Sequence, residues 1–105
     1  VEEVGSKYER HTLFPQRINV EFAQVVKRDR ILVRVWERGS GITRSCGTGA
    51  CAALVAAKRR NLAGRSAEMV LDGGSLLINW RVDDHVLMTG PVSTTFHGSI
   101  RLQEL

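Results

Sequence analysis

The chain has 105 residues, 43% of them hydrophobic and 25% charged, which indicates one folded domain over residues 1–105 and excludes an intrinsically disordered protein. No apolar run approaches the roughly 20 residues of a membrane-spanning helix, and the first residues lack the basic start and apolar stretch of a signal peptide, so we expect a cytoplasmic protein without a membrane partner. A net charge of +4 permits the binding of anions, from nucleic acid down to small carboxylates.

The first part of the chain is predicted to hold a connecting segment and a β-hairpin. Residues 1–17 are polar and show no sustained period, so we expect little regular structure there. Two runs rich in β-branched and aromatic residues follow at 18–26 and 31–36, and the polar residues 27–29 form the turn between them. Glycines and hydroxyl side chains over residues 37–45 then indicate a loop.

A single helix is predicted from Cys46 to a point before Gly64. Lysine and arginine in its last turn suit the negative end of the helix dipole. Every residue from 50 to 57 is small or apolar, so this stretch has no polar face. We therefore expect the helix to be buried on all sides.

The remainder of the chain indicates β-structure, which supplies the cover that such a helix needs. Four further strands joined by short polar turns are predicted at residues 67–72, 75–80, 85–90 and 92–102. The predicted fold is therefore α+β, with a strongly curved, mainly antiparallel, barrel-like β-sheet wrapped around one central buried α-helix.

The start of the predicted helix is a candidate anion site. Gly47 and Gly49 leave backbone N–H groups bare at the positive end of the helix dipole, where a carboxylate or phosphate fits. Cys46 lies at the same end, where the dipole stabilises a thiolate and makes the sulfur a candidate base or nucleophile. These residues are equally compatible with a cysteine that is merely packed. Cys51 is beyond disulfide reach of Cys46 along a helix, so we expect two thiols, and the apolar run around Cys51 indicates an inert one.

Three other kinds of site are not favoured. Residues 47–52 fit the dinucleotide pattern G-x-G-x-x-A, but the loop before them and the hairpin after them argue against the β-α-β unit that this pattern requires. The histidines are scattered and the cysteines lack a zinc spacing, so we expect no metal. The helix dipole accounts for the basic residues 58–60, and we expect no nucleic-acid partner.

Four short motifs together resemble the diaminopimelate epimerase family in their order and spacing. Asn19 comes first, within the phrase FPQRINVEF, and residues 37–41 (ERGSG) follow. Next come residues 46–53 (CGTGACAA) and residues 88–91 (MTGP). The likeness extends from about residue 5 to residue 100 and corresponds to the C-terminal half of proteins of that family.

The resemblance implies an isomerase of two similar domains, each a curved sheet around a central helix, that face one another across a cleft. It implies no pyridoxal phosphate, metal or other cofactor. Two cysteines act instead on opposite faces of the substrate: one thiolate removes the α-proton and the other thiol returns a proton. By this resemblance Cys46 is one of the two and the second precedes residue 1, so we expect the chain alone to be inactive.

The resemblance also implies the substrate and its contacts. The backbone N–H groups of Gly47 and Thr48 are expected to bind the α-carboxylate, which stabilises charge as the carbanion forms. Asn19, Glu37 and Arg38 are the other expected substrate contacts. The implied reaction interconverts LL- and meso-diaminopimelate, in the biosynthesis of lysine and of peptidoglycan precursors.

Two departures from the family pattern leave the substrate open. Ile42 stands where the family usually has glutamate, and Ser45 stands where it commonly has alanine. Related amino-acid racemases and phenazine-biosynthesis isomerases share the architecture. A non-catalytic domain that binds an anion at the helix end is the alternative from another class.

The end of the chain is expected to be an interaction segment. In the family, residues 92–105 are expected to pack against the N-terminal half of the same enzyme. Without that partner their apolar side chains, Phe96, Ile100 and Leu102, are expected to be exposed. Exposed strand and apolar surface favour a homodimer or aggregation.

Overall fold

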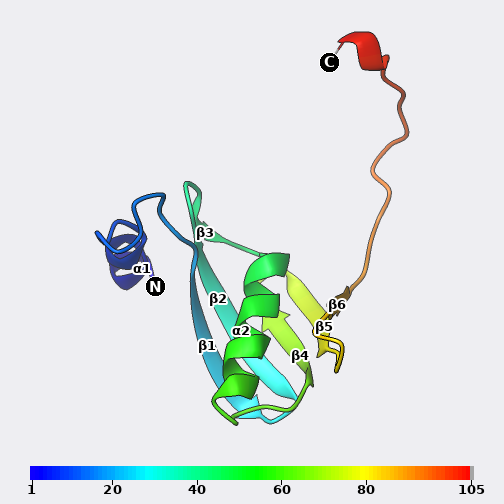
Figure 1. The fold of residues 1–105 in the computed structure, drawn as a ribbon. Coiled ribbons are helices and arrows are strands. Elements are labelled where there is room, and N and C mark those ends of the chain that lie inside the picture. The colour runs from blue at the N-terminus through cyan, green and yellow to red at the C-terminus, as the bar shows by residue number, and fades with distance from the viewer. Residues whose placement is uncertain (105) are drawn as a thin grey trace.

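The computed structural model describes residues 1–104, and the side chains of residues 1–103. A six-stranded sheet with one helix across it forms the body of the molecule, and a second helix lies beside the sheet (Figure 1). The elements in chain order are α1 (Glu2–Glu9), β1 (Val20–Lys27), β2 (Arg30–Glu37), β3 (Gly41–Thr43), α2 (Gly47–Arg59), β4 (Ser66–Leu71), β5 (Gly74–Trp80), β6 (Val86–Thr89) and a 3₁₀ turn, η1 (Leu102–Glu104). Over this range no helix has the length and apolar character that crossing a membrane requires.

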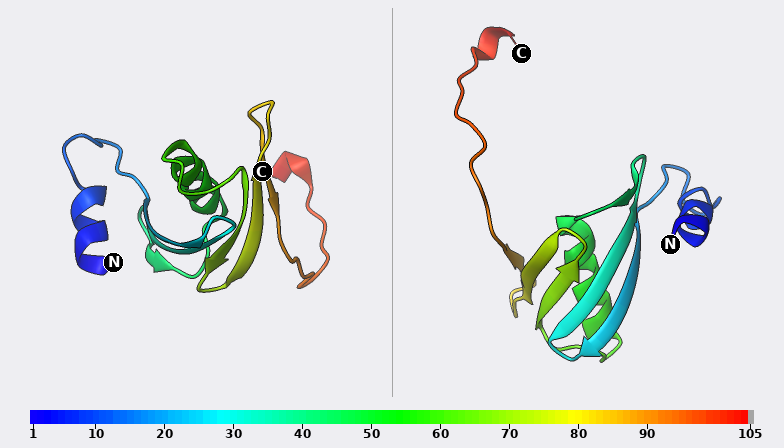
Figure 2. Two further views of the ribbon diagram at one scale, coloured as in Figure 1. Left: turned by 90° about the horizontal axis from the view of Figure 1, so that it is seen from below. Right: turned by 180° about the vertical axis from the view of Figure 1, so that it is seen from behind.

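The sheet is mixed and open. Its strand order is β1-β2-β4-β5-β6, and the short β3 pairs with the end of β2. Neighbouring strands are antiparallel except β2 and β4, which are parallel. The sheet curves around one side of α2 and does not close, so β1 and β6 remain its edges (Figure 2). The predicted α+β class and the curved, mainly antiparallel sheet are confirmed, and the described strands form an open half of a barrel.

The core lies between α2 and the face of the sheet that it covers. Alternation along β2 buries Ile31, Val33 and Val35, while the residues between them are exposed. On the facing side, α2 contributes the fully buried Leu54 and several alanines. These small side chains let the helix approach the strands closely, and Met69 of β4 fills the space beside Leu54 in the same cluster.

Replacing Leu54 by alanine is expected to lower the free energy of unfolding by about 2–5 kcal/mol, because the change removes buried methyl groups and leaves a cavity. Urea unfolding followed by tryptophan fluorescence measures the loss. The matched control is Leu62→Ala, since the Leu62 side chain is half exposed just after the same helix. Equal losses in the two variants would contradict the core described here.

The helix α1 lies in the segment for which the sequence predicts little regular structure, and that prediction is wrong. The helix depends on contacts from outside its own segment. A Cβ atom added to Gly5 would lie 2.5 Å from the Cβ atom of Trp36, so glycine is required for this approach although it is a poor helix former. At the end of α1, the carboxylate of Glu9 accepts a hydrogen bond from Trp36 Nε1 at 2.7 Å.

Two strand predictions also differ from the structure. Residues 37–45 are not wholly a loop, because β3 pairs Ile42 with Trp36. Residues 92–102 are not a strand: beyond β6 the chain extends away from the sheet as far as η1 (Figure 1), and Phe96 is 81% exposed. The alternating sequence of this segment lacks a neighbouring edge among the described strands, and a strand forms only where an edge supplies hydrogen bonds.

One face of α2 is exposed, so the prediction of burial on all sides is wrong. Ala52 and Ala56 face solvent, because the open sheet covers only the opposite side of the helix. A groove runs between this face and the β1 edge, where Ala23, Val25 and Leu62 complete a largely apolar lining. The described strands therefore bury only part of the apolar surface of α2.

Candidate functional site

The N-terminus of α2 presents unpaired backbone donors. Cys46 is the N-cap residue in an extended conformation, and its carbonyl accepts the N–H of Ala50 at 3.0 Å. The N–H groups of Gly47 and Thr48, in the first turn, have no acceptor within the helix. Together with the helix dipole, these donors favour a bound anion.

The two cysteines lie in different surroundings. Cys46 is 7% exposed, and its Sγ atom lies 3.6 Å from the hydroxyl of Thr48. Cys51 is half-buried farther along α2, where burial raises the pKa of its thiol and the nearby Cys46 adds to the rise. Both cysteines are free, as predicted. The higher pKa keeps Cys51 a thiol, whereas Cys46 lies beside the open donors.

The two glycines of the CGTG motif lie in close contact with side chains of the sheet. A Cβ atom on Gly47 would lie 2.8 Å from Met88 Sδ on β6. A Cβ atom on Gly49 would lie 2.6 Å from Glu21 Oε1 on β1 and 3.2 Å from Cys46 Sγ. Side chains from both edge strands of the sheet therefore reach the first turn of α2, and a side chain at either glycine would displace the ends of Met88 and Glu21.

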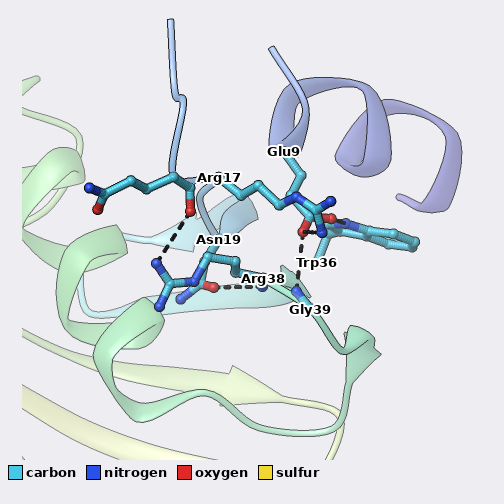
Figure 3. A network of polar contacts seen from close by, with 7 residues as sticks. Glu9, Arg17, Asn19, Trp36, Arg38 and Gly39 are labelled. Carbon is cyan, nitrogen blue, oxygen red and sulfur yellow. Dashed lines mark hydrogen bonds and ion pairs between the residues drawn. The ribbon is translucent and has the colours of Figure 1, made fainter. Parts of the chain in front are cut away.

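Asn19 and Arg38 lie beside this helix end and hold each other in place (Figure 3). The Asn19 side-chain oxygen accepts the backbone N–H of Arg38 at 2.7 Å, and Arg38 Nη1 donates to the carbonyl of Gln16 at 3.5 Å. Asn19, Arg38, Thr48 and Gly49 line a hollow of about 480 Å³. This volume suits a small ligand such as an amino acid.

Two glutamates, Glu37 and Glu21, lie near the site, and only Glu21 lines the hollow. Glu37, at the end of β2, accepts a hydrogen bond from the Thr43 hydroxyl at 2.6 Å and lies outside the lining of the hollow. Glu21 lines the hollow, although the sequence analysis does not name it. Asn19 and Glu21 are two positions apart, so in an extended chain their side chains share a face. That spacing is the signal that could have found Glu21.

A second polar network ties α1 to the ERG segment and was also missed. The buried Glu9 carboxylate accepts hydrogen bonds from Trp36 Nε1 at 2.7 Å and from the Gly39 N–H at 3.1 Å, and Arg17 Nη1 lies 4.0 Å away (Figure 3). The Trp36 bond lowers the pKa of the Glu9 carboxyl most, and the Gly39 bond comes next. This network fixes the backbone next to Arg38.

The lowered pKa of Glu9 predicts acid-sensitive stability. The carboxylate stabilises the fold above the ordinary carboxyl range, and this contribution is lost as the pH falls through the lowered pKa. Glu9→Gln is therefore expected to reduce the free energy of unfolding at neutral pH and to have little effect at about pH 3. Urea unfolding at both pH values measures the difference, with the exposed Glu2→Gln as control. A loss that is the same at both pH values would contradict the prediction.

The structure thus brings some, but not all, of the predicted site residues together. Asn19, Arg38 and Thr48 line one hollow, and Cys46 and Gly47 adjoin it at the helix start. Glu37 does not line the hollow, and its carboxylate accepts the Thr43 hydroxyl instead. Within residues 1–104, no group of three or more histidine, cysteine, aspartate or glutamate side chains is arranged to hold a metal ion.

Comparison with known sequences gives one consistent result. The sequence profile described as "Diaminopimelate epimerase" matches residues 1–95. The diaminopimelate epimerase of Rhodospirillum centenum is 61% identical over 97 residues, which are 92% of this chain and 33% of the relative. That of Phenylobacterium zucineum is 61% identical over 92 residues (88% and 33%), and that of Bacteroides thetaiotaomicron is 54% identical over 99 residues (93% and 37%). The chain therefore spans about a third of the length of these relatives.

Proposed function

Because the chain belongs to the diaminopimelate epimerase family, we propose that it forms the C-terminal half of an isomerase that interconverts LL- and meso-diaminopimelate. The activity belongs to the whole protein, of which this chain supplies one side of the active site. The observation that carries the proposal is the position of Cys46, at the N-terminus of α2 beside a hollow that has room for an amino acid.

The proposed reaction inverts the α-carbon by moving protons on its two sides. The Cys46 sulfur faces one side and a cysteine of the N-terminal half faces the other. The thiolate takes the α-proton, the electron pair of the broken C–H bond stays on carbon, and the opposite thiol gives its proton to that carbon. The two sulfurs exchange protonation states, so the proposed reaction uses neither pyridoxal phosphate nor a metal.

The residues around Cys46 fit the charges that this reaction develops. The α-carboxylate is proposed to bind the N–H groups of Gly47 and Thr48, where the helix dipole stabilises negative charge as the carbanion forms. Asn19 and Arg38, which also line the hollow, are proposed to supply an amide and a guanidinium to polar groups of the substrate.

Glu37 is proposed as the contact for the substrate ammonium. Its Oε2 atom already accepts the Thr43 hydroxyl at 2.6 Å. That bond holds the side chain of Glu37 in one position, and the proposal assigns the other carboxylate oxygen to the ammonium. In this proposal the Glu37 carboxylate and the Arg38 guanidinium together match a ligand that carries both charges.

The proposed setting is the cytoplasm, in the biosynthesis of lysine and of peptidoglycan precursors. Two free thiols fit a reducing compartment, where cysteines persist without pairing. The substrate assignment follows from the name of the relatives, diaminopimelate epimerase. Ile42 and Ser45 are the positions at which this chain departs from the family pattern.

The proposal is tested by exchange of the α-proton of diaminopimelate into D₂O, followed by NMR. The chain is measured alone and after co-expression with the remaining two thirds of the Rhodospirillum centenum relative. We expect no exchange with the chain alone, and exchange in the assembled complex. A complex that forms and binds diaminopimelate without exchange would support the alternative of a non-catalytic anion-binding domain.

Two variants of the complex sharpen this test. Cys46→Ser is expected to lower the exchange rate by at least about 100-fold, since a positioned acid–base group contributes that much or more. The matched control Cys51→Ala removes the other thiol of the same helix and is expected to retain most of the rate. Equal losses in both variants would remove the distinction between the two cysteines.

Residues 92–102 are proposed to pair with the N-terminal half. The even-numbered positions from 92 to 102 carry Val92, Phe96, Ile100 and Leu102 together with a threonine and a glycine, and the odd-numbered positions are all polar. This is the pattern of a strand with one covered face. In this chain Ile100 is 68% exposed. In the proposal, the backbone of this segment pairs with a sheet edge of the N-terminal half, and the apolar face is covered there.

Left without that partner, the chain is expected to self-associate, because an exposed segment with unpaired backbone groups and an apolar face pairs readily with another chain. Light scattering is expected to show dimers or larger species for the chain alone and a one-to-one complex once the N-terminal half is present. The double variant Phe96→Ser with Ile100→Ser is expected to be more nearly monomeric. A parent chain that is already monomeric at high concentration would contradict this expectation.

A further inference from the structure

A half-buried carboxylate, that of Glu21, lies on the side of β1 that faces α2. Glu21 pairs with Val35 in the antiparallel register of β1 and β2, and residues paired across two strands place their side chains on the same face. Val35 is buried on that face. Within residues 1–104, no lysine, arginine or histidine forms an ion pair with the Glu21 carboxylate. Ion pairing therefore does not explain a carboxylate at this half-buried position.

The carboxylate of Glu21 is a near neighbour of the Cys46 sulfur. A Cβ atom on Gly49 would lie 2.6 Å from Glu21 Oε1 and 3.2 Å from Cys46 Sγ. The oxygen and the sulfur are therefore within about 6 Å of each other, a range in which one charge shifts the protonation of another group. The missing side chain of Gly49 leaves the space between them open.

We propose that Glu21 is a positioning residue that favours the thiol state of Cys46 in the free protein, so that Cys46 is the proton donor in one direction of the reaction. The inference rests on the proposed function of Cys46. A negative carboxylate beside the sulfur disfavours a second negative charge there and opposes the helix dipole, which favours the thiolate. A site with two cysteines needs one thiol and one thiolate, and Glu21 gives one side of the site a distinct charge.

The other charged groups around the sulfur do not cancel this effect. Arg17 and Arg38 line the same hollow, but both are exposed, so water and salt screen their charges. Glu37 adds negative charge, and Cys51 contributes a thiol farther along α2. Burial raises the pKa of the Glu21 carboxyl, and Glu37 adds a smaller rise, so measurements run upward from neutral pH, above the usual carboxyl range.

The test measures how fast Cys46 reacts with iodoacetamide as a function of pH, in the full chain with the background change Cys51→Ala. Iodoacetamide is neutral, so the charge of Glu21 acts on the thiol and not on the reagent. Because the thiolate is the reactive form, Glu21→Gln is expected to react about 3- to 10-fold faster at neutral pH and to reach its midpoint at lower pH. The limiting rate at high pH is expected to stay unchanged.

Two variants separate charge from packing. Glu21→Asp keeps the charge and is expected to restore the parent midpoint, whereas Glu68→Gln removes a carboxylate of β4 that pairs with Arg30 and is expected to change nothing. Thiolate absorbance near 240 nm reports the same midpoint without depending on access of the reagent to the sulfur.

Coincident midpoints for the parent and Glu21→Gln would overturn the inference about Glu21. A change confined to the limiting rate would also overturn it, since that result reports packing alone. Neither result touches the proposed function, which is judged by α-proton exchange in the assembled complex and fails there independently of the Glu21 variants.

Discussion

The close approach of the first turn of α2 to the strands is the contact on which the site depends. Gly47 lies against the end of the Met88 side chain of β6 and Gly49 against the end of the Glu21 side chain of β1, so a methyl group at either position would require these side-chain ends to move. Cys46 precedes this turn as the N-cap residue of α2. The same glycines start the helix without a side-chain cap, so its first N–H groups stay available to a ligand. The small residues of this motif therefore serve both the packing of the helix end and its capacity to bind a ligand.

The parallel pairing of β2 and β4 explains why distant residues meet at this end of the sheet. Two parallel strands need a crossover between them, and α2 is that crossover, so it runs back against the direction of β2. Its N-terminus therefore lies near the end of β2, where Glu37 and Arg38 follow. The antiparallel β1 begins at the same end, just after Asn19. A single topological feature brings together residues 19, 38 and 46.

The open sheet explains what the chain leaves exposed. The described strands cover one face of α2, and its opposite face forms an apolar groove with the edge of β1. The segment after β6 has the alternation of a strand but no neighbouring edge. Both features belong to a chain that spans about a third of the length of its relatives. The apolar residues of α2 and of the segment after β6 are thus suited to contacts that the described residues do not make.

The strands β1, β2, β4, β5 and β6, the helix α2 and the motif around Cys46 could be predicted from the sequence, because hydrophobic period and glycine placement act over a few neighbouring residues. The helix α1 and the burial of Glu9 could not. Gly5 is unfavourable in an isolated helix, and its value depends on Trp36, which lies 31 positions away in the chain. The predicted burial of α2 was too extensive for the same reason. An apolar sequence indicates that a helix can be buried, but the arrangement of the strands determines which of its faces is buried.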